Sequence, residues 1–206
     1  QDARGREQLC REQEVRLKGG FIHPTVGGDI FGSRDADHGA GRTDALRQQG
    51  IVTLSADFSS EAGILDFIDR LKAQVRSLRA IVHNASDWAP DSSGDDAGSN
   101  FERLFRVHMQ APYLINLHCR ELLDACSEPQ RDIVHMTDYV ASRGSKKHAA
   151  YAATKAGIAM LAEGLQMELA NTPIKVTTLF PGFIRSEINE KLKNTPFIVD
   201  TETGCK

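Results

Sequence analysis

The sequence predicts an α/β fold with a doubly wound parallel sheet that is incomplete at both ends. Residues 132–136 and 174–179 are apolar runs of strand length, and they flank a long stretch with apolar side chains at helical spacing. An earlier pair of runs, residues 51–55 and 78–83, flanks a second amphipathic stretch. Right-handed crossovers make the strands of such units parallel. No strand with a glycine turn is recognisable near the start, and no last strand near the end.

The first half of the chain predicts alternating helices and strands. A short helix is expected over residues 43–49, followed by the strand at 51–55. Residues 61–75 predict an amphipathic helix, because their apolar side chains recur on one face. Residues 101–126 predict a long helical region that contains Pro112.

The second half contains the most informative unit. The strand at residues 132–136 leads through a polar loop at 141–148 into a long helix, which Pro173 ends. The apolar face of that helix is formed by Ile158, Leu161, Leu165 and Leu169. The strand at residues 174–179 follows and is closed by Pro181-Gly182.

Tyr151 and Lys155 lie four residues apart near the start of this helix, which places both side chains on one face. A neighbouring ammonium stabilises a phenolate, so we expect Lys155 to lower the pKa of Tyr151 from its ordinary value of about 10. A phenol tuned in this way can exchange a proton near neutral pH. The same spacing also occurs in purely structural pairs, so the neighbouring sequence must decide whether this pair is catalytic or structural.

Composition restricts the class of function. The chain has 206 residues and a net charge of −3, which gives no broad electrostatic case for nucleic acid. No apolar run approaches the length of a membrane span, and the charged start lacks the apolar core of a signal peptide. The four cysteines show no metal-binding spacing. We therefore expect reduced thiols, no metal site and a cytoplasmic location.

Three short motifs resemble those of a known family: Ala56-Asp57-Phe58-Ser59, His83-Asn84-Ala85-Ser86 and His135-Met136-Thr137-Asp138-Tyr139. Together with the Tyr-Lys helix and the Pro-Gly pair, they resemble the short-chain dehydrogenase/reductases over about residues 43–190. Residues from about 43 to 157 are most similar to the dihydromonapterin and pteridine reductases of that family. The resemblance implies a Rossmann-like reductase domain at residues 29–206, preceded by an atypical or loosely ordered segment at 1–28.

The implied activity is NADPH-dependent reduction of a pterin-type small molecule, such as dihydromonapterin or dihydrofolate. Tyr151 would donate the proton, Lys155 would also hold the ribose hydroxyls of the cofactor, and Asp138 would relay the proton. Asp138 stands thirteen residues before Tyr151, where most of the family has a serine. A carboxylate suits a C=N bond, because a proton must reach nitrogen as hydride reaches carbon. The alternative is that Asp138 only caps the loop.

Two further side chains have a functional and a structural interpretation. His108 stands at the place of the family's catalytic asparagine, where it would bond a water or a carbonyl. A helix histidine bonded within the core is the alternative. Trp88 would line a pocket over a flat substrate, or it packs against the protein as single tryptophans often do.

The resemblance also assigns cofactor contacts to Arg34, Asp57, Asn84, Ala85, Pro181, Gly182 and Ser186, together with Tyr151 and Lys155. Asp57 would accept a hydrogen bond from the adenine amino group, although Asp57 or Ser59 capping the next helix is the alternative. Asn84 and Ala85 would border the cofactor ribose. Pro181, Gly182 and Ser186 would hold the nicotinamide carboxamide.

The N-terminal glycines allow two alignments. Gly28-Asp-Ile-Phe-Gly32 is the nearest match to a phosphate-binding glycine turn. However, a proline interrupts the run at residues 21–26, Arg34 occupies the place of the third glycine, and Asp57 follows too soon. In the other alignment, residues 29–34 form the second strand. Arg34 then faces the 2′-phosphate of NADP, or it is a solvated loop arginine.

Two other functions stay open. The later third of the chain resembles general members of the family, which suggests a short-chain alcohol or carbonyl oxidoreductase. The unrecognised glycine turn and last strand suggest a non-catalytic, truncated or rearranged remnant. The family also implies a homo-oligomer, a dimer or a tetramer, that buries the helices around residues 101–126 and 148–170.

Overall fold

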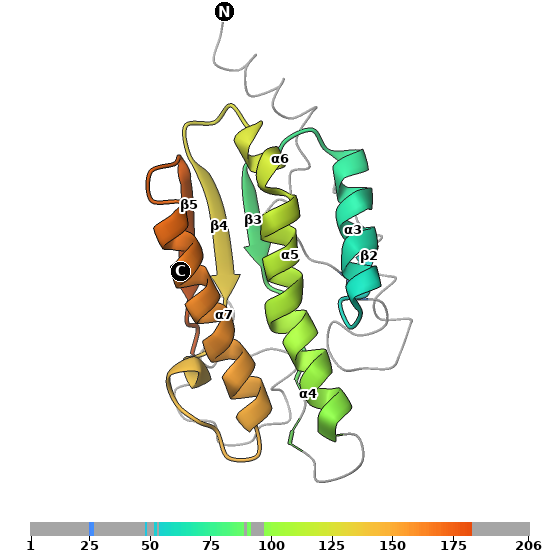
Figure 1. The fold of residues 1–206 in the computed structure, drawn as a ribbon, viewed down its shortest axis with the longest axis vertical. Coiled ribbons are helices and arrows are strands. Elements are labelled where there is room, and N and C mark those ends of the chain that lie inside the picture. Colours follow the sequence, from blue (N-terminus) through green and yellow to red (C-terminus); the bar gives the residue numbers. More distant parts are fainter. Residues whose placement is uncertain are drawn as a thin grey trace, which may run out of the picture.

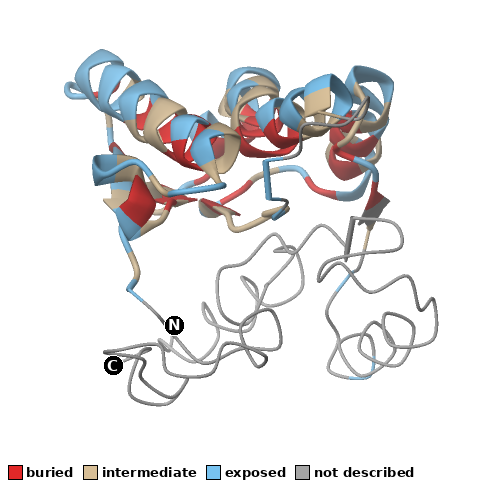
Figure 2. Ribbon diagram, turned by 90° about the horizontal axis from the view of Figure 1, so that it is seen from below, coloured by how far each residue is buried: buried red, intermediate tan, exposed pale blue. Residues whose placement is uncertain are grey.

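The computed structural model describes residues 25–26, 48, 52, 54–88, 90–91 and 97–182. Three parallel strands form a sheet in the order β3 (Ala80–His83), β4 (Arg131–Met136) and β5 (Ile174–Leu179). The described long helices form one layer against one face of this sheet, as Figure 1 and Figure 2 show. The predicted α/β fold with a parallel sheet is confirmed.

The register of the strands brings their carboxyl ends to one edge of the sheet. His83 pairs with His135 at the end of β3, and Met136 pairs with Leu179 at the end of β4. In Figure 1 this edge is the lower end, at the arrowheads of β3 and β4. Open α/β sheets bind ligands outside the carboxyl ends of their strands. A ligand-binding site is therefore expected among the residues that follow β3, β4 and β5.

Helix α3 (Glu61–Gln74) forms where the apolar spacing predicts it. Its buried face consists of Ile64, Phe67, Ile68 and Leu71. Burying side chains of this size contributes about 1.5–3 kcal/mol each. The N-cap is Ser60, whose hydroxyl accepts a hydrogen bond from the backbone N–H of Gly63 at 3.1 Å. The alternative that Asp57 or Ser59 caps this helix is therefore wrong.

The helical region predicted at residues 101–126 is interrupted. It consists of α4 (Ala97–Phe105), the π-helix η1 (Arg106–Gln110), α5 (Ala111–His118) and α6 (Arg120–Asp124). Pro112 explains the π-helix, because proline lacks an N–H and its ring crowds the carbonyl four residues earlier. That carbonyl belongs to His108, and the wider π turn relieves the crowding.

Helix α7 (Ala149–Glu168) packs against β4 and β5, and it follows the short 3₁₀-helix η2 (Tyr139–Ser142). Ile158 and Leu169 are buried, as the apolar spacing predicts. Leu161 is 37 % exposed, so its placement on the buried face was wrong. The inner side of α7 is completed by the small residue Ala162, which lets the helix approach the sheet closely.

Strand β1 (Thr25–Val26) pairs in parallel with β2 (Ser55–Ala56). Of the run at residues 21–26, which was expected to be interrupted by the proline at position 24, only the two residues after the proline are described, and they pair with β2. Strand β2 begins at the last residue of the strand predicted over 51–55. Gly28, Gly32, Arg34 and the candidate strand at residues 29–34 lie outside the described residues.

Candidate active site

Three of the predicted catalytic residues meet at the carboxyl edge of the sheet. Asp138 follows β4, while Tyr151 and Lys155 lie in the first two turns of α7. The Oη atom of Tyr151 donates a hydrogen bond to Oδ2 of Asp138 at 3.1 Å. The chain reverses through η2 and the following loop, and this reversal brings the phenol back to the end of the strand.

The Asp138 carboxylate is held in place by its other oxygen. Oδ1 accepts a hydrogen bond from the backbone N–H of Val140 at 3.1 Å, which makes Asp138 the N-cap of η2. The sequence left two interpretations of Asp138, a cap and a partner of Tyr151. Both contacts exist, and they use different oxygens of one carboxylate, so the cap orients the oxygen that faces the phenol.

Lys155 is 4 % exposed. Its Nζ donates a hydrogen bond to the carbonyl of Met136 at 3.4 Å and lies 5.6 Å from the centroid of the Tyr151 ring. Burial lowers the pKa of Lys155 to about 8, and the Asp138 carboxylate partly offsets this effect. In the described part of the chain no carboxylate forms an ion pair with Lys155. An ammonium has three donors, so this one can still bind a ligand.

The pKa of Tyr151 is raised, mainly by burial and further by the charge and the hydrogen bond of Asp138. A hydrogen bond from Ser86 opposes this rise. The expectation that Lys155 lowers the pKa of Tyr151 was therefore wrong. Burial is the largest cause, and the nearer charge adds to it: the carboxylate accepts directly from the phenol, whereas the ammonium lies beside the ring. The phenol is protonated at neutral pH.

His108 lies in η1, next to the Tyr151 ring, with the two rings edge to face and their centroids 5.4 Å apart. Its Nδ1 bonds Thr154 Oγ1 at 2.8 Å, and its Nε2 accepts from the backbone N–H of Asp87 at 3.0 Å. Because Thr154 Oγ1 donates to the Tyr151 carbonyl at 2.9 Å, the proton between His108 and Thr154 belongs to Nδ1. His108 is thus a neutral histidine, and burial sets its pKa well below the ordinary value.

Sequence reasoning missed several side chains that complete this environment. Thr154 connects His108 to the backbone of Tyr151, and Ser86 lies 3.2 Å from His108 Nε2. Asp87 forms an ion pair with Arg103 of α4. Thr137 ties the end of β4 to α7, because its hydroxyl donates to the carbonyl of Lys155 at 2.8 Å. The available signal was position, since Thr137 directly follows the strand predicted at 132–136, while Ser86 and Asp87 lie three and four residues after the one predicted at 78–83.

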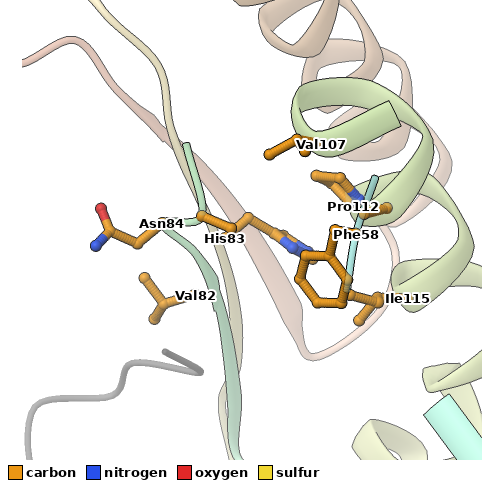
Figure 3. Close-up of a pocket in the computed structure, with 9 residues that line it drawn as sticks. Phe58, Val82, His83, Asn84, Val107, Pro112 and Ile115 are labelled. Carbon is orange, nitrogen blue, oxygen red and sulfur yellow. The ribbon is translucent and has the colours of Figure 1, made fainter. Parts of the chain in front are cut away.

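The expected cofactor residues are only partly described. Asp57 is exposed after β2, and its Oδ1 accepts from the N–H and the hydroxyl of Ser59 at 2.9 and 2.6 Å. Asn84 and Ala85 follow β3, while Pro181 and Gly182 follow β5. Figure 3 shows the side chain of Asn84 directed away from the helix residues opposite it. Ser186 and Arg34 lie outside the described residues.

A small cavity of about 20 Å³ lies between β3 and α5, and Figure 3 shows it. It is lined by Phe58, Val82, His83, Asn84, Ala85, Val107, Ala111, Pro112 and Ile115. Its size suits about one water molecule, so it is a packing gap and not a dinucleotide site.

The described residues contain no group of three or more histidine, cysteine, aspartate or glutamate side chains arranged to hold a metal ion. None of their helices combines the length and apolar character that crossing a membrane requires.

The sequence of this chain matches a known protein family and curated relatives. The family model for short chain dehydrogenases matches residues 30–196. The dihydromonapterin reductase of Klebsiella pneumoniae is 42% identical over 141 residues, which cover 68% of this chain and 58% of the relative. The dihydromonapterin reductase of Escherichia coli K12 is 36% identical over the same shares. The chain therefore spans less than two thirds of the length of these curated relatives.

Solved structures show the same fold. RhlG from Pseudomonas aeruginosa, in an active-site complex with NADP, has a TM-score of 0.67 at 24% identity, covering 80% of this chain and 66% of that one. FolM alternative dihydrofolate reductase 1 from Brucella canis, complexed with NADP, has a TM-score of 0.62 at 19% identity, covering 77% and 62%. At such identities the likeness concerns the fold alone.

Proposed function

This chain belongs to the short-chain dehydrogenase/reductase family, and on that basis we propose that it is an NADPH-dependent reductase of a pterin-type substrate. The observation that carries the proposal is the hydrogen bond from Tyr151 to Asp138. A carboxylate beside the phenol suits reduction of a C=N bond, where nitrogen must receive a proton. The dihydromonapterin reductases among the relatives support the same substrate class.

In the proposed reaction, a hydride adds to the carbon of the C=N bond and a proton adds to its nitrogen. NADPH supplies the hydride when it is bound. Tyr151 supplies the proton, because its raised pKa keeps the phenol protonated until the substrate nitrogen becomes basic. The ammonium of Lys155 stabilises the phenolate that remains. Asp138, which reaches the phenol oxygen directly, then returns a proton to it from solvent.

We assign the cofactor contacts by position at the carboxyl edge. Lys155 would hold the ribose hydroxyls with its spare donors, and Asn84 and Ala85 would border the same sugar. Pro181, Gly182 and Ser186 would hold the carboxamide of the nicotinamide. At the adenosine end, Asp57 would accept from the adenine amino group and Arg34 would face the 2′-phosphate.

Trp88 is the candidate wall for a flat substrate. It is 53 % exposed, although an indole of this size is usually covered in a protein without a ligand. It belongs to the same connection as Ser86, which reaches the phenol. A pterin ring stacked on the indole would cover this apolar surface.

We propose further that the protein is a homo-oligomer, either a dimer or a tetramer, in the cytoplasm. Several large apolar side chains on α4, α5 and α7 are exposed: Phe101, Phe105, Tyr113, Leu117, Met160 and Met167. Burial of such a surface against a second copy is a common use of exposed apolar patches. The free, buried thiols of Cys119 and Cys126 suit a reducing compartment.

Two measurements test the reductase function. NADPH fluorescence is titrated with the protein, and turnover of a dihydropterin is compared with turnover of a simple ketone. We expect saturable NADPH binding, preference for the dihydropterin, and loss of turnover in Tyr151→Phe with folding and NADPH binding intact. Preference for the ketone would indicate a carbonyl oxidoreductase instead. No saturable binding would identify a non-catalytic member of the family.

A further inference from the structure

Asp91 contacts the start of the helix that carries Tyr151 from 58 residues away in the sequence. Its Oδ2 accepts a hydrogen bond from the backbone N–H of Ala149 at 2.6 Å, and its Oδ1 accepts from Ala150 at 3.2 Å. The first N–H groups of a helix have no partner within the helix. His148 occupies the N-cap position of α7 but makes no side-chain capping bond. Asp91 therefore caps α7 in its place.

Two more contacts join the same two segments. The backbone N–H of Asp91 donates to the carbonyl of Lys147 at 2.7 Å. The rings of Trp88 and His148 stack with their centroids 4.9 Å apart and their planes at 30°. Lys147 has φ 65°, which is uncommon for a residue with a Cβ, and surrounding contacts must hold it there. Backbone, carboxylate and ring contacts thus all hold the two segments together.

The residues after β3 are also attached on their other side. Asp87 pairs with Arg103 of α4, and its N–H donates to His108 of η1. Residues 86–88 and 91 consequently lie between α4 and α7, with the capped turn of α7 ending one residue before Tyr151. Movement of this connection away from α7 would remove the cap and the indole–imidazole stack at the same time.

We propose that Asp91 is a positioning residue, which by capping α7 holds Tyr151 against Asp138 and Trp88 against His148. One carboxylate thereby couples the wall of the site to the proton donor. The effect on substrate binding rests on the proposed reductase function. The positions of the Tyr151 and Trp88 side chains do not depend on that function, so they can be measured without any substrate.

The test compares Asp91→Ala with Asp91→Asn, which keeps one acceptor oxygen for the helix N–H groups. The matched control is Asp66→Ala, an exposed aspartate on α3 that pairs with Arg70 far along the chain from the site. Trp88 is the single tryptophan of the chain, so fluorescence and its quenching by acrylamide report on the Trp88–His148 stack. Phenolate absorbance, with Tyr151→Phe as the reference, gives the pH midpoint at which Tyr151 ionises.

For Asp91→Ala we expect easier quenching of Trp88 and a lower ionisation midpoint for Tyr151, because the phenol moves away from Asp138. Asp91→Asn should recover part of both effects, and Asp66→Ala should show neither. With a dihydropterin and saturating NADPH, KM for the dihydropterin should rise about tenfold in Asp91→Ala. The proposal is overturned if Asp91→Ala lowers only the melting temperature and leaves quenching and the Tyr151 midpoint unchanged. A wild-type protein inactive on dihydropterins would refute the proposed function, while both spectroscopic readouts would still decide the role of Asp91.

Discussion

The phenol of Tyr151 donates its hydrogen bond to the Asp138 carboxylate at 3.1 Å, whereas the ammonium of Lys155 lies 5.6 Å from the centre of the phenol ring. Burial of the phenol, together with the charge and the hydrogen bond of Asp138, raises the pKa of Tyr151 instead of lowering it. A tyrosine in this state stays protonated at neutral pH, and its phenol is a weaker acid than that of a free tyrosine. It suits a reaction in which the substrate itself becomes basic during hydride addition.

Replacing Asp138 with asparagine should lower the pKa of Tyr151, because the negative charge that raises it is removed. The pKa of Lys155 should fall as well, since Asp138 raises it. Dihydropterin turnover should fall on the order of a hundredfold if the carboxylate returns the proton. Phenolate absorbance and steady-state rates measure the two effects. A Tyr151 midpoint equal to that of the wild type would contradict the contribution assigned to Asp138.

Replacing His108 with alanine should lower the free energy of unfolding by about 1–3 kcal/mol. The change leaves the N–H of Asp87 and the hydroxyl of Thr154 without their partner in the interior. Urea unfolding measures the loss, and His118→Ala, at an exposed histidine of α5, is the control. Unchanged stability together with a collapse of kcat would instead indicate that His108 acts directly in proton transfer.

The free energy of unfolding should fall as the pH falls from about 6.5 to about 3, because burial lowers the pKa of His135 to about 3. Above pH 6.5, His135 is neutral in both states and contributes nothing. Below it, the unfolded chain binds a proton that the folded chain does not, which costs about 1.4 kcal/mol per pH unit for one histidine. His83, stacked on His135 with centroids 4.6 Å apart, has a pKa lowered to about 4 and adds to this loss.

Urea unfolding of wild type and His135→Gln over this pH range isolates the contribution of His135. The variant should show a shallower dependence of the unfolding free energy on pH. His118→Gln, at an exposed histidine of α5, is the control variant. Equal slopes in His135→Gln and wild type would mean that His135 titrates normally in the folded chain.

Replacing Gly63 with alanine should destabilise the protein by about 1–3 kcal/mol. A Cβ at this position would lie 2.1 Å from the backbone oxygen of Asp57, which cannot move as a side chain can. Gly164 in α7 is the matched control, because no atom lies within 4 Å of a Cβ placed there. Gly164→Ala should stabilise the protein by about 0.5–1 kcal/mol through helix propensity. Thermal or urea unfolding compares both variants, and similar effects would refute the clash.

Several features follow from the sequence because they depend on short-range patterns. Apolar spacing located α3 and α7, and apolar runs located β3, β4 and β5. The four-residue separation placed Tyr151 and Lys155 on one side of a helix. Local patterns were less informative where two effects compete. The helical region predicted around Pro112 contains a π-helix that no local pattern indicated, and a serine one residue further along capped α3 in place of Asp57 or Ser59.

The sequence by itself determined the order of strands and helices, the family, and which residues stand at the carboxyl edge of the sheet. Only the tertiary structure decided the direction of the Tyr151 pKa, the partners of His108 and the cap that Asp91 places on α7. The physical reason is range. Periodicity and spacing act between near neighbours in the chain, whereas desolvation and hydrogen bonding depend on distances in space between residues far apart in sequence.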